Sequence, residues 1–154
     1  MQADARREAP DSPRRWCFGC GDANPEGLRI QFQVDGRRVS GEFEARQVHQ
    51  GYPGLAHGGI AAAAIDEAMG WAMYAAGVWA MTARLEVKYR RPLPLGRPLR
   101  VTAEVLRDRG RWLEAAGELR VAGGPLIAEA KALFMRLPAD KAREMQAFYL
   151  AGSA

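Results

Sequence analysis

Hydrophobic and polar positions alternate in several stretches of this chain, which is the pattern of half-buried β-strands. The first alternating stretch is 28–34, and the Asp35-Gly36 turn signal after it predicts a hairpin with a second strand over 37–45. Later stretches of the same kind occupy 80–90, 99–105, 113–121 and 126–137. We therefore expect about five to six antiparallel strands, with the last four joined by short turns into a meander.

One long segment lacks this alternation. Residues 58–76 read GGIAAAAIDEAMGWAMYAA, and their apolar side chains leave no face polar enough for solvent. This pattern predicts a buried helix, whose small residues let it lie close against a sheet. An antiparallel sheet wrapped around one long central helix hides both apolar surfaces, so the predicted fold class is α+β. Pro138 is expected to open an additional C-terminal helix.

Length and composition are those of one ordinary globular domain. The chain has 154 residues, of which 48% are hydrophobic and 26% charged. Residues 1–15 lack periodicity and predict a disordered or loose tail, which leaves 16–154 as a single domain. The polar N-terminus and the absence of a long apolar run predict a cytoplasmic protein without a membrane span. The net charge of +4 suits a phosphate-bearing ligand, but it also suits an ordinary basic protein.

The start of the central helix, His57-Gly58-Gly59, is a candidate binding site. Two glycines there let a ligand approach the backbone closely. The first N–H groups of a helix lack internal partners and carry partial positive charge, so they suit an oxygen that becomes negative, such as a carbonyl under attack. A glycine turn that only allows tight helix–sheet packing explains the same residues.

Asp66 lies in the middle of this apolar helix. An isolated carboxylate there is costly unless it is paired, hydrated or neutralised, so Asp66 is a candidate acid, base or nucleophile. A bond to a nearby arginine, or a place at a subunit boundary, is the structural alternative. Asp66 and Gly58 are roughly 12 Å apart along one helix, too far to act on one carbonyl. If both groups are functional, two antiparallel copies of the helix must meet in a C2 homodimer.

Three other features carry weaker signals. Thr82 stands on the strand face opposite Leu85 and Val87, where it can orient a water or simply suit a strand. Basic residues around one predicted turn can hold phosphates or form a solvated rim; they are Lys88, Arg90, Arg91, Arg97 and Arg100. Cys17 and Cys20 form a C-x-x-C pair without the second half of a zinc finger, which favours a structural role over a metal or redox role.

Taken together, the motifs resemble those of the hotdog-fold acyl-CoA thioesterases, and in particular the PaaI- and THEM-like branch. In chain order they are CFGCG at 17–21, NPEGL at 24–28, QGYPG at 50–54, HGG at 57–59, DE at 66–67, YRRP at 89–92 and Gly96. The resemblance covers roughly residues 16–137. It implies that the sheet wraps the central helix, that two chains join their sheets edge to edge, and that the active site lies between subunits.

The resemblance also implies residue roles. Asp66 corresponds to the family's helix acid, acting as a general base towards water or as a nucleophile. The Gly58 amide, with Gly59 beside it, polarises the thioester carbonyl, and His57 opens the same motif. Thr82 corresponds to the strand hydroxyl that helps to position water. The residues expected to contact the substrate are Gln50, Arg90 and Arg91.

The implied partners are an acyl-CoA substrate and a second copy of the chain, as a homodimer or a dimer of dimers. No metal, other cofactor, nucleic acid or membrane is expected. One departure is Gly51, which stands where some members carry an Asn six residues before the motif histidine.

Two rival functions remain open. A hotdog hydratase or dehydratase needs a histidine that works with an acid, whereas His57 lies far from Asp66 on its own helix. A non-catalytic module that binds acyl or aromatic ligands is the other alternative, although the chain retains both Asp66 and the His-Gly-Gly motif.

Overall fold

The structure is a computed structural model that describes residues 13–150. Most of the predicted N-terminal tail, residues 1–12, lies outside the described residues. The described chain begins with a short 3-10 helix, η2 (Pro13–Trp16). No helix within 13–150 is long and apolar enough to cross a membrane.

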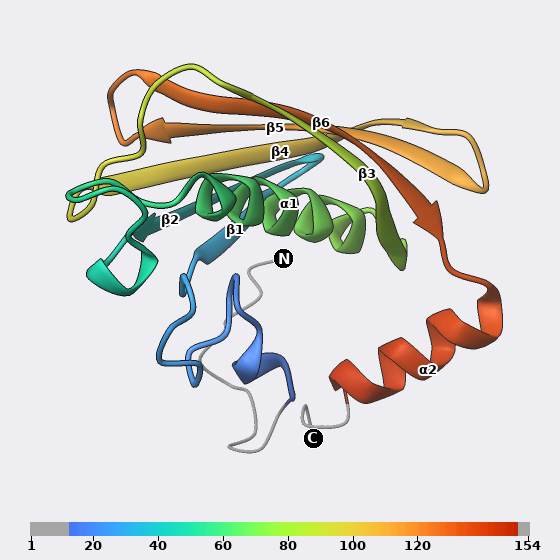
Figure 1. Cartoon of the computed structure of the whole chain (residues 1–154). Coiled ribbons are helices and arrows are strands. Elements are labelled where there is room, and N and C mark those ends of the chain that lie inside the picture. Colours follow the sequence, from blue (N-terminus) through green and yellow to red (C-terminus); the bar gives the residue numbers. More distant parts are fainter. Residues whose placement is uncertain (1–12, 151–154) are drawn as a thin grey trace.

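Six strands form one antiparallel sheet in the order β1-β2-β4-β5-β6-β3. They are β1 (Gln31–Asp35), β2 (Arg38–Glu44), β3 (Ala80–Tyr89), β4 (Pro98–Asp108), β5 (Trp112–Val121) and β6 (Leu126–Arg136). In Figure 1 this sheet curves over helix α1 (Gly58–Ala75). The predicted α+β architecture, with a sheet around one long central helix, is therefore confirmed.

Helix α1 packs into the concave face of the sheet. The residues that it buries share one broad apolar face; they are Ala61, Ala64, Ile65, Ala68, Met69, Ala72 and Met73. At the closest approach, a Cβ on Gly117 of β5 would lie 2.7 Å from Ile65 Cγ2. The alanine-rich helix and a glycine in the sheet thus let the two layers touch.

The predicted four-strand meander is wrong. β4, β5 and β6 pair in sequence, but β3 pairs with β6 at one edge while β4 pairs with β2. The segment between β3 and β4 is therefore a crossover and not a tight turn. Its backbone bonds to other segments instead: Ala56 N donates to Leu93 O, and Gly96 N donates to Ala45 O, both at 2.9 Å.

A β-bulge in β3 corrects a second expectation. Thr82 lies opposite Phe134, whereas the next paired residue, Arg84, lies opposite Leu133, so Ala83 is an extra residue in the strand. The extra residue shifts the alternation by one position. Thr82 consequently faces helix α1, on the same side as Leu85, and not the opposite side as the sequence suggested.

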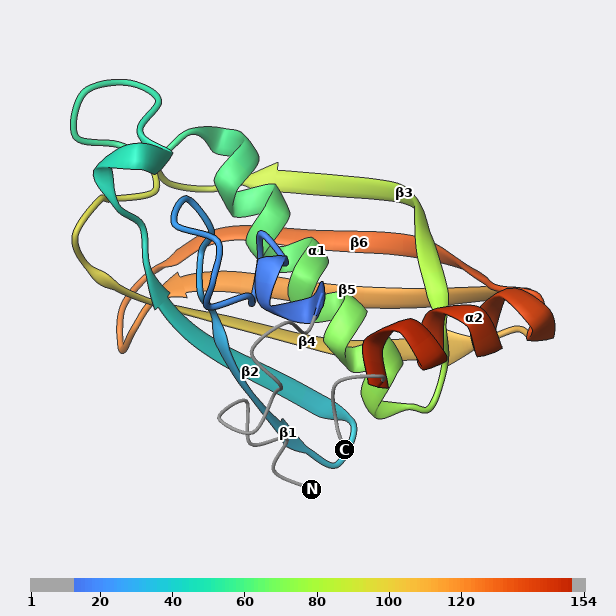
Figure 2. The same cartoon turned by 90° about the horizontal axis from the view of Figure 1, so that it is seen from below.

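A second layer covers the other side of α1. Figure 2 shows η2 and the loop after it lying over α1, with helix α2 (Ala139–Leu150) beside them. This loop also explains why the first strand begins at Gln31 and not at Leu28 as predicted. Leu28 N and Ile30 N donate to Phe18 O and Gly19 O of the loop, at 2.7 and 2.9 Å, and not to β2. The α1 helix therefore has the sheet on one side and the cysteine loop on the other.

Candidate active site

The His-Gly-Gly motif caps the N-terminus of α1. His57 is the N-cap residue, and its Nδ1 accepts the Gly59 N–H at 2.9 Å. The Gly58 N–H, in contrast, finds no hydrogen-bond acceptor among residues 13–150. Of the two amides singled out in the sequence, only that of Gly58 is therefore available to a ligand.

Tyr89 fixes the same turn from the end of β3. Its hydroxyl donates to Gly58 O at 2.8 Å, although the side chain is 53% exposed. The sequence argument gave Tyr89 no role. The signal was its place at the end of an alternating strand, directly before the Arg90-Arg91 pair.

A cavity of about 410 Å³ opens in front of this turn. Its lining includes Gly58, Tyr89, Arg90 and Arg91. The structure thus brings the two predicted phosphate-binding arginines next to the free Gly58 amide. Arg90 also pairs with Glu129 at 3.2 Å, so part of its charge is already compensated.

The side chains of Gln50 and His49 form hydrogen bonds with backbone groups around the loop that precedes the helix. The Gln50 side-chain oxygen accepts the Gly54 N–H at 3.1 Å. His49 is buried, with Arg46 N donating to its Nδ1 and its Nε2 lying 2.7 Å from Glu26 O. Gln50 is not among the residues that line the cavity beside Gly58.

Asp66 meets Thr82 on the other half of the helix. The Thr82 hydroxyl donates to Asp66 Oδ1 at 2.7 Å, which holds the carboxylate against the start of β3. The bulge at Ala83 makes this bond possible because it turns Thr82 towards the helix. Within one chain, Asp66 and Gly58 stay about two helical turns apart, as the sequence spacing requires.

Glu67 points away from Asp66, into a cluster with the two cysteines. Cys17 Sγ lies 3.3 Å from Glu67 Oε1, where the thiol can donate to the carboxylate. Burial, followed by the charge on Cys17, raises the pKa of Glu67 to about 7. The hydrogen bond between the thiols is the largest influence on both: it lowers the pKa of Cys17 and raises the pKa of Cys20.

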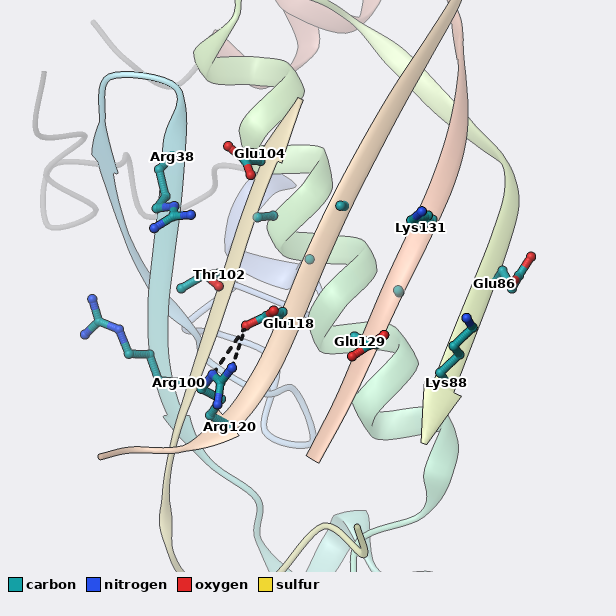
Figure 3. Close-up of a pocket in the computed structure, with 14 residues that line it drawn as sticks. Arg38, Glu86, Lys88, Arg100, Thr102, Glu104, Glu118, Arg120, Glu129 and Lys131 are labelled. Carbon is teal, nitrogen blue, oxygen red and sulfur yellow. Dashed lines mark hydrogen bonds and ion pairs between the residues drawn. The ribbon is translucent and has the colours of Figure 1, made fainter. Parts of the chain in front are cut away.

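Another hollow lies elsewhere, on the outer face of the sheet (Figure 3). Its volume is about 560 Å³, and its side chains point away from α1, which lies behind the sheet in this view. The charged residues around it are of both signs; they are Arg38, Glu86, Lys88, Arg100, Glu104, Glu118, Arg120, Glu129 and Lys131. A mixed rim of this kind does not select an anion, and Asp66 does not reach it.

The edge of the sheet next to Asp66 is open in the single chain. β3 pairs only with β6, so the other side of its backbone has no partner strand among the described residues. The strand is ten residues long, and Met81 near its start is 57% exposed. A long exposed edge of this kind is a template for pairing with another chain.

Comparison with known proteins agrees with this architecture. Residues 53–128 match the family model described as the thioesterase superfamily. The acyl-coenzyme A thioesterase THEM4 of Mus musculus is 34% identical over 122 residues, which are 75% of this chain and 52% of THEM4. The THEM4 of Xenopus laevis is 35% identical over 66% of this chain. The chain thus spans about half the length of the curated relatives that it matches.

Solved structures give the same result. A crystal structure of a thioesterase superfamily protein is 33% identical, with a TM-score of 0.65 over 69% of this chain and 55% of its own. A mutant of the phenylacetic acid degradation protein PaaI from Thermus thermophilus is 26% identical, with a TM-score of 0.66 over 73% of this chain and 96% of its own.

The curved sheet, the central helix and its capped glycine turn define a hotdog-fold protein. The chain belongs to the thioesterase superfamily, in the branch that contains the PaaI and THEM proteins.

Proposed function

We propose that this chain is an acyl-CoA thioesterase that hydrolyses an acyl-CoA to the free acid and coenzyme A. The observation that carries the proposal is the carboxylate of Asp66, fixed by Thr82 at 2.7 Å beside an open sheet edge. Membership of the thioesterase superfamily supports it, as does the name of the THEM4 relatives, which are acyl-coenzyme A thioesterases.

The proposed active unit is a homodimer joined through β3. If two copies of this strand pair antiparallel about a two-fold axis near its middle, the start of one strand faces the end of the other. Thr82 and Asp66 of one chain then approach the Tyr89 end of its partner. Gly58, whose N–H is free, lies at that end because its carbonyl oxygen accepts a hydrogen bond from the Tyr89 hydroxyl. In such a dimer, Asp66 of one chain and Gly58 of the other can act on one carbonyl, which their spacing along a single helix does not allow.

The proposed reaction needs only these groups. Asp66 takes a proton from water, and the water oxygen attacks the thioester carbonyl carbon. The partner's Gly58 N–H stabilises the negative charge that grows on the carbonyl oxygen, helped by the partial positive charge at the helix N-terminus. When the C–S bond breaks, Asp66 returns the proton to the departing thiolate. Arg90 and Arg91 hold phosphates of coenzyme A in the cavity beside Gly58.

The test is release of free thiol from short, long and aromatic acyl-CoAs. We expect turnover by the wild type and a loss of about 10²–10⁴-fold in kcat for Asp66→Asn, the usual contribution of a general base. Asp35→Asn, at an exposed β1–β2 turn, is the matched control and should keep wild-type kcat. Equal turnover by Asp66→Asn and the wild type, or no turnover of any acyl-CoA by a folded dimeric wild type, would contradict the proposal.

A further inference from the structure

The cluster of Cys17, Cys20 and Glu67 offers three metal-ligating atoms in one place. The two thiol sulfurs and a Glu67 carboxylate oxygen all lie within 4.8 Å of one another. The ligands come from the cysteine loop and from the middle of α1, which are 50 residues apart in the chain. The sequence argument looked for the second half of a zinc finger and therefore missed a carboxylate that only the fold brings close.

We propose that Cys17, Cys20 and Glu67 bind one Zn²⁺ ion, with a water as the fourth ligand. Tetrahedral zinc has Zn–S bonds of about 2.3 Å and Zn–O bonds of about 2.0–2.2 Å, which sets its ligand atoms roughly 3.6–3.8 Å apart. The cluster reaches this geometry with shifts of roughly 1 Å. Thiolate sulfur together with a carboxylate oxygen is a ligand set that zinc accepts.

The backbone around the cysteines holds the ligands in position. Gly21 N donates to Cys17 O at 2.9 Å, which closes the turn that contains both thiols. Gly19 lets this turn lie directly on the helix, because a Cβ at Gly19 would come within 2.4 Å of Glu67 Cγ. An ion pair of 2.8 Å between Arg15 and Asp22 clamps the two ends of the loop.

The charge balance of the cluster favours a cation. Glu67 is half-buried beneath the cysteine loop, and no Lys or Arg of the described chain forms an ion pair with it. A carboxylate removed from water without a cation is unfavourable. When Zn²⁺ binds, the two thiols lose their protons to solvent, and two positive charges face three negative ones.

The fourth position has room for its water. A cavity of about 160 Å³ adjoins the three ligands, whereas a water in liquid occupies about 30 Å³. Gly70 and the aromatic side chains of Trp71, Tyr74, Trp79 and Tyr149 form the rest of its lining. Because Asp66 points to Thr82 instead, the zinc site is separate from the proposed hydrolytic site, and its test does not depend on thioester hydrolysis.

The test uses Co²⁺ as a spectroscopic probe of the full chain, reduced and stripped of metal with a chelator. We expect one Co²⁺ per chain, a thiolate-to-cobalt charge-transfer band in the near ultraviolet, visible bands of tetrahedral intensity, and displacement by an equivalent of Zn²⁺. Cys17→Ser and Cys20→Ser should each weaken Co²⁺ binding by at least roughly 10–100-fold, the loss that even supporting residues of metal sites produce.

Glu67→Gln decides whether the site has three protein ligands, because it preserves shape and both thiols. We expect the same minimum loss of roughly 10–100-fold in Co²⁺ affinity. Asp66→Asn is the matched control, since it removes the adjacent carboxylate, and it should bind Co²⁺ like the wild type. Circular dichroism of each metal-free variant checks folding. The proposal is overturned if the reduced wild type shows no charge-transfer band, or if folded Glu67→Gln binds Co²⁺ with wild-type affinity.

Discussion

At the scale of single residues, the contact between Thr82 and Asp66 is the feature on which the proposed chemistry depends. The Thr82 hydroxyl donates a hydrogen bond of 2.7 Å to Asp66 Oδ1. This bond holds the carboxylate in place and occupies one lone pair of that oxygen. In the proposed reaction, the other carboxylate oxygen takes the proton of the attacking water. Thr82 is consequently a positioning residue, and its loss should affect the chemical step more than substrate binding.

Thr82→Val preserves the shape of the side chain and removes the hydroxyl. A hydrogen bond to a charged group contributes about 1.5–3 kcal/mol, so we expect kcat to fall by about 10–150-fold with KM within about twofold of the wild type. Steady-state kinetics with the best acyl-CoA measures this split. Thr102→Val makes the same change on the outer face of β4 and should leave kcat unaltered. A rise in KM with normal kcat would assign Thr82 to substrate binding.

At the scale of elements, local patterns predicted more than long-range pairing. Alternation predicted the β1–β2 hairpin, and an apolar segment without alternation predicted α1, because neighbouring residues are enough to show which strand face or helix is buried. Alternation failed at Ala83, because this bulge residue is apolar and stands where the alternating pattern expects an apolar residue. The sequence therefore shows no break at the bulge. Alternation also failed for the crossover between β3 and β4, whose hydrogen bonds are made with distant segments.

The candidate site likewise has one part that is local in sequence and one part that depends on long-range contacts. The His57-Gly58-Gly59 cap is local in sequence, and the structure forms it at the predicted place. The meeting of Glu67 with Cys17 depends on how the N-terminal loop folds over the helix, which no short-range pattern records. Sequence reasoning therefore predicted the His57 cap but not the cysteine–carboxylate cluster, and the roles of Asp66 and Gly58 stay predictions.

The loop before α1 provides a prediction at this scale. A Cβ on Gly51 would lie 2.9 Å from His57 Cα, which is backbone and cannot move aside alone. Gly51→Ala should therefore lower the free energy of unfolding by about 1–3 kcal/mol, the usual cost of overpacking. The same contact predicts that an Asn at this position is unfavourable as well. Urea denaturation followed by circular dichroism gives the value.

Gly70→Ala is the control, and its expected change in the free energy of unfolding has the opposite sign. Gly70 lies inside α1, and its added Cβ meets nothing within 4 Å. Alanine in a helix interior is favoured over glycine by roughly 0.5–1 kcal/mol, so this variant should be more stable than the wild type. Equal stability of Gly51→Ala and the wild type would show that the loop yields to the extra methyl group.

At the scale of the whole molecule, the proposed active site requires two chains. Asp66 and the free Gly58 amide lie too far apart in one chain, and β3 offers an unpaired edge through which two copies can join. This arrangement can be tested by complementation, because each chain would give different groups to each of two sites. One defective chain should then supply what the other lacks.

The two defects are Asp66→Asn and Gly58→Pro. Proline suits the first position of a helix, and His57, with φ −59° and ψ 141°, already has the extended backbone that a following proline requires. Gly58→Pro therefore removes the N–H while it keeps the helix. Each variant alone should be inactive, but random exchange of subunits makes half of the dimers mixed, with one intact site in each. We expect recovery of about one quarter of wild-type activity, measured as thiol release.

The control is Gly58→Pro combined with Asp66→Asn in one chain and mixed with wild type. If each site combines Asp66 of one chain with Gly58 of its partner, both sites of a mixed dimer carry one defect, and the mixed dimers should be inactive. If each site lies within one chain, both defects fall in one site and the wild-type chain keeps the other site active. With equal amounts of the two proteins, the mixture should therefore show about one quarter of wild-type activity in the first case and about one half in the second. Recovery by the two single variants, with mixed dimers verified by native mass spectrometry, is therefore the discriminating result. If mixed dimers form and remain inactive, Asp66 and Gly58 do not act together across the dimer interface.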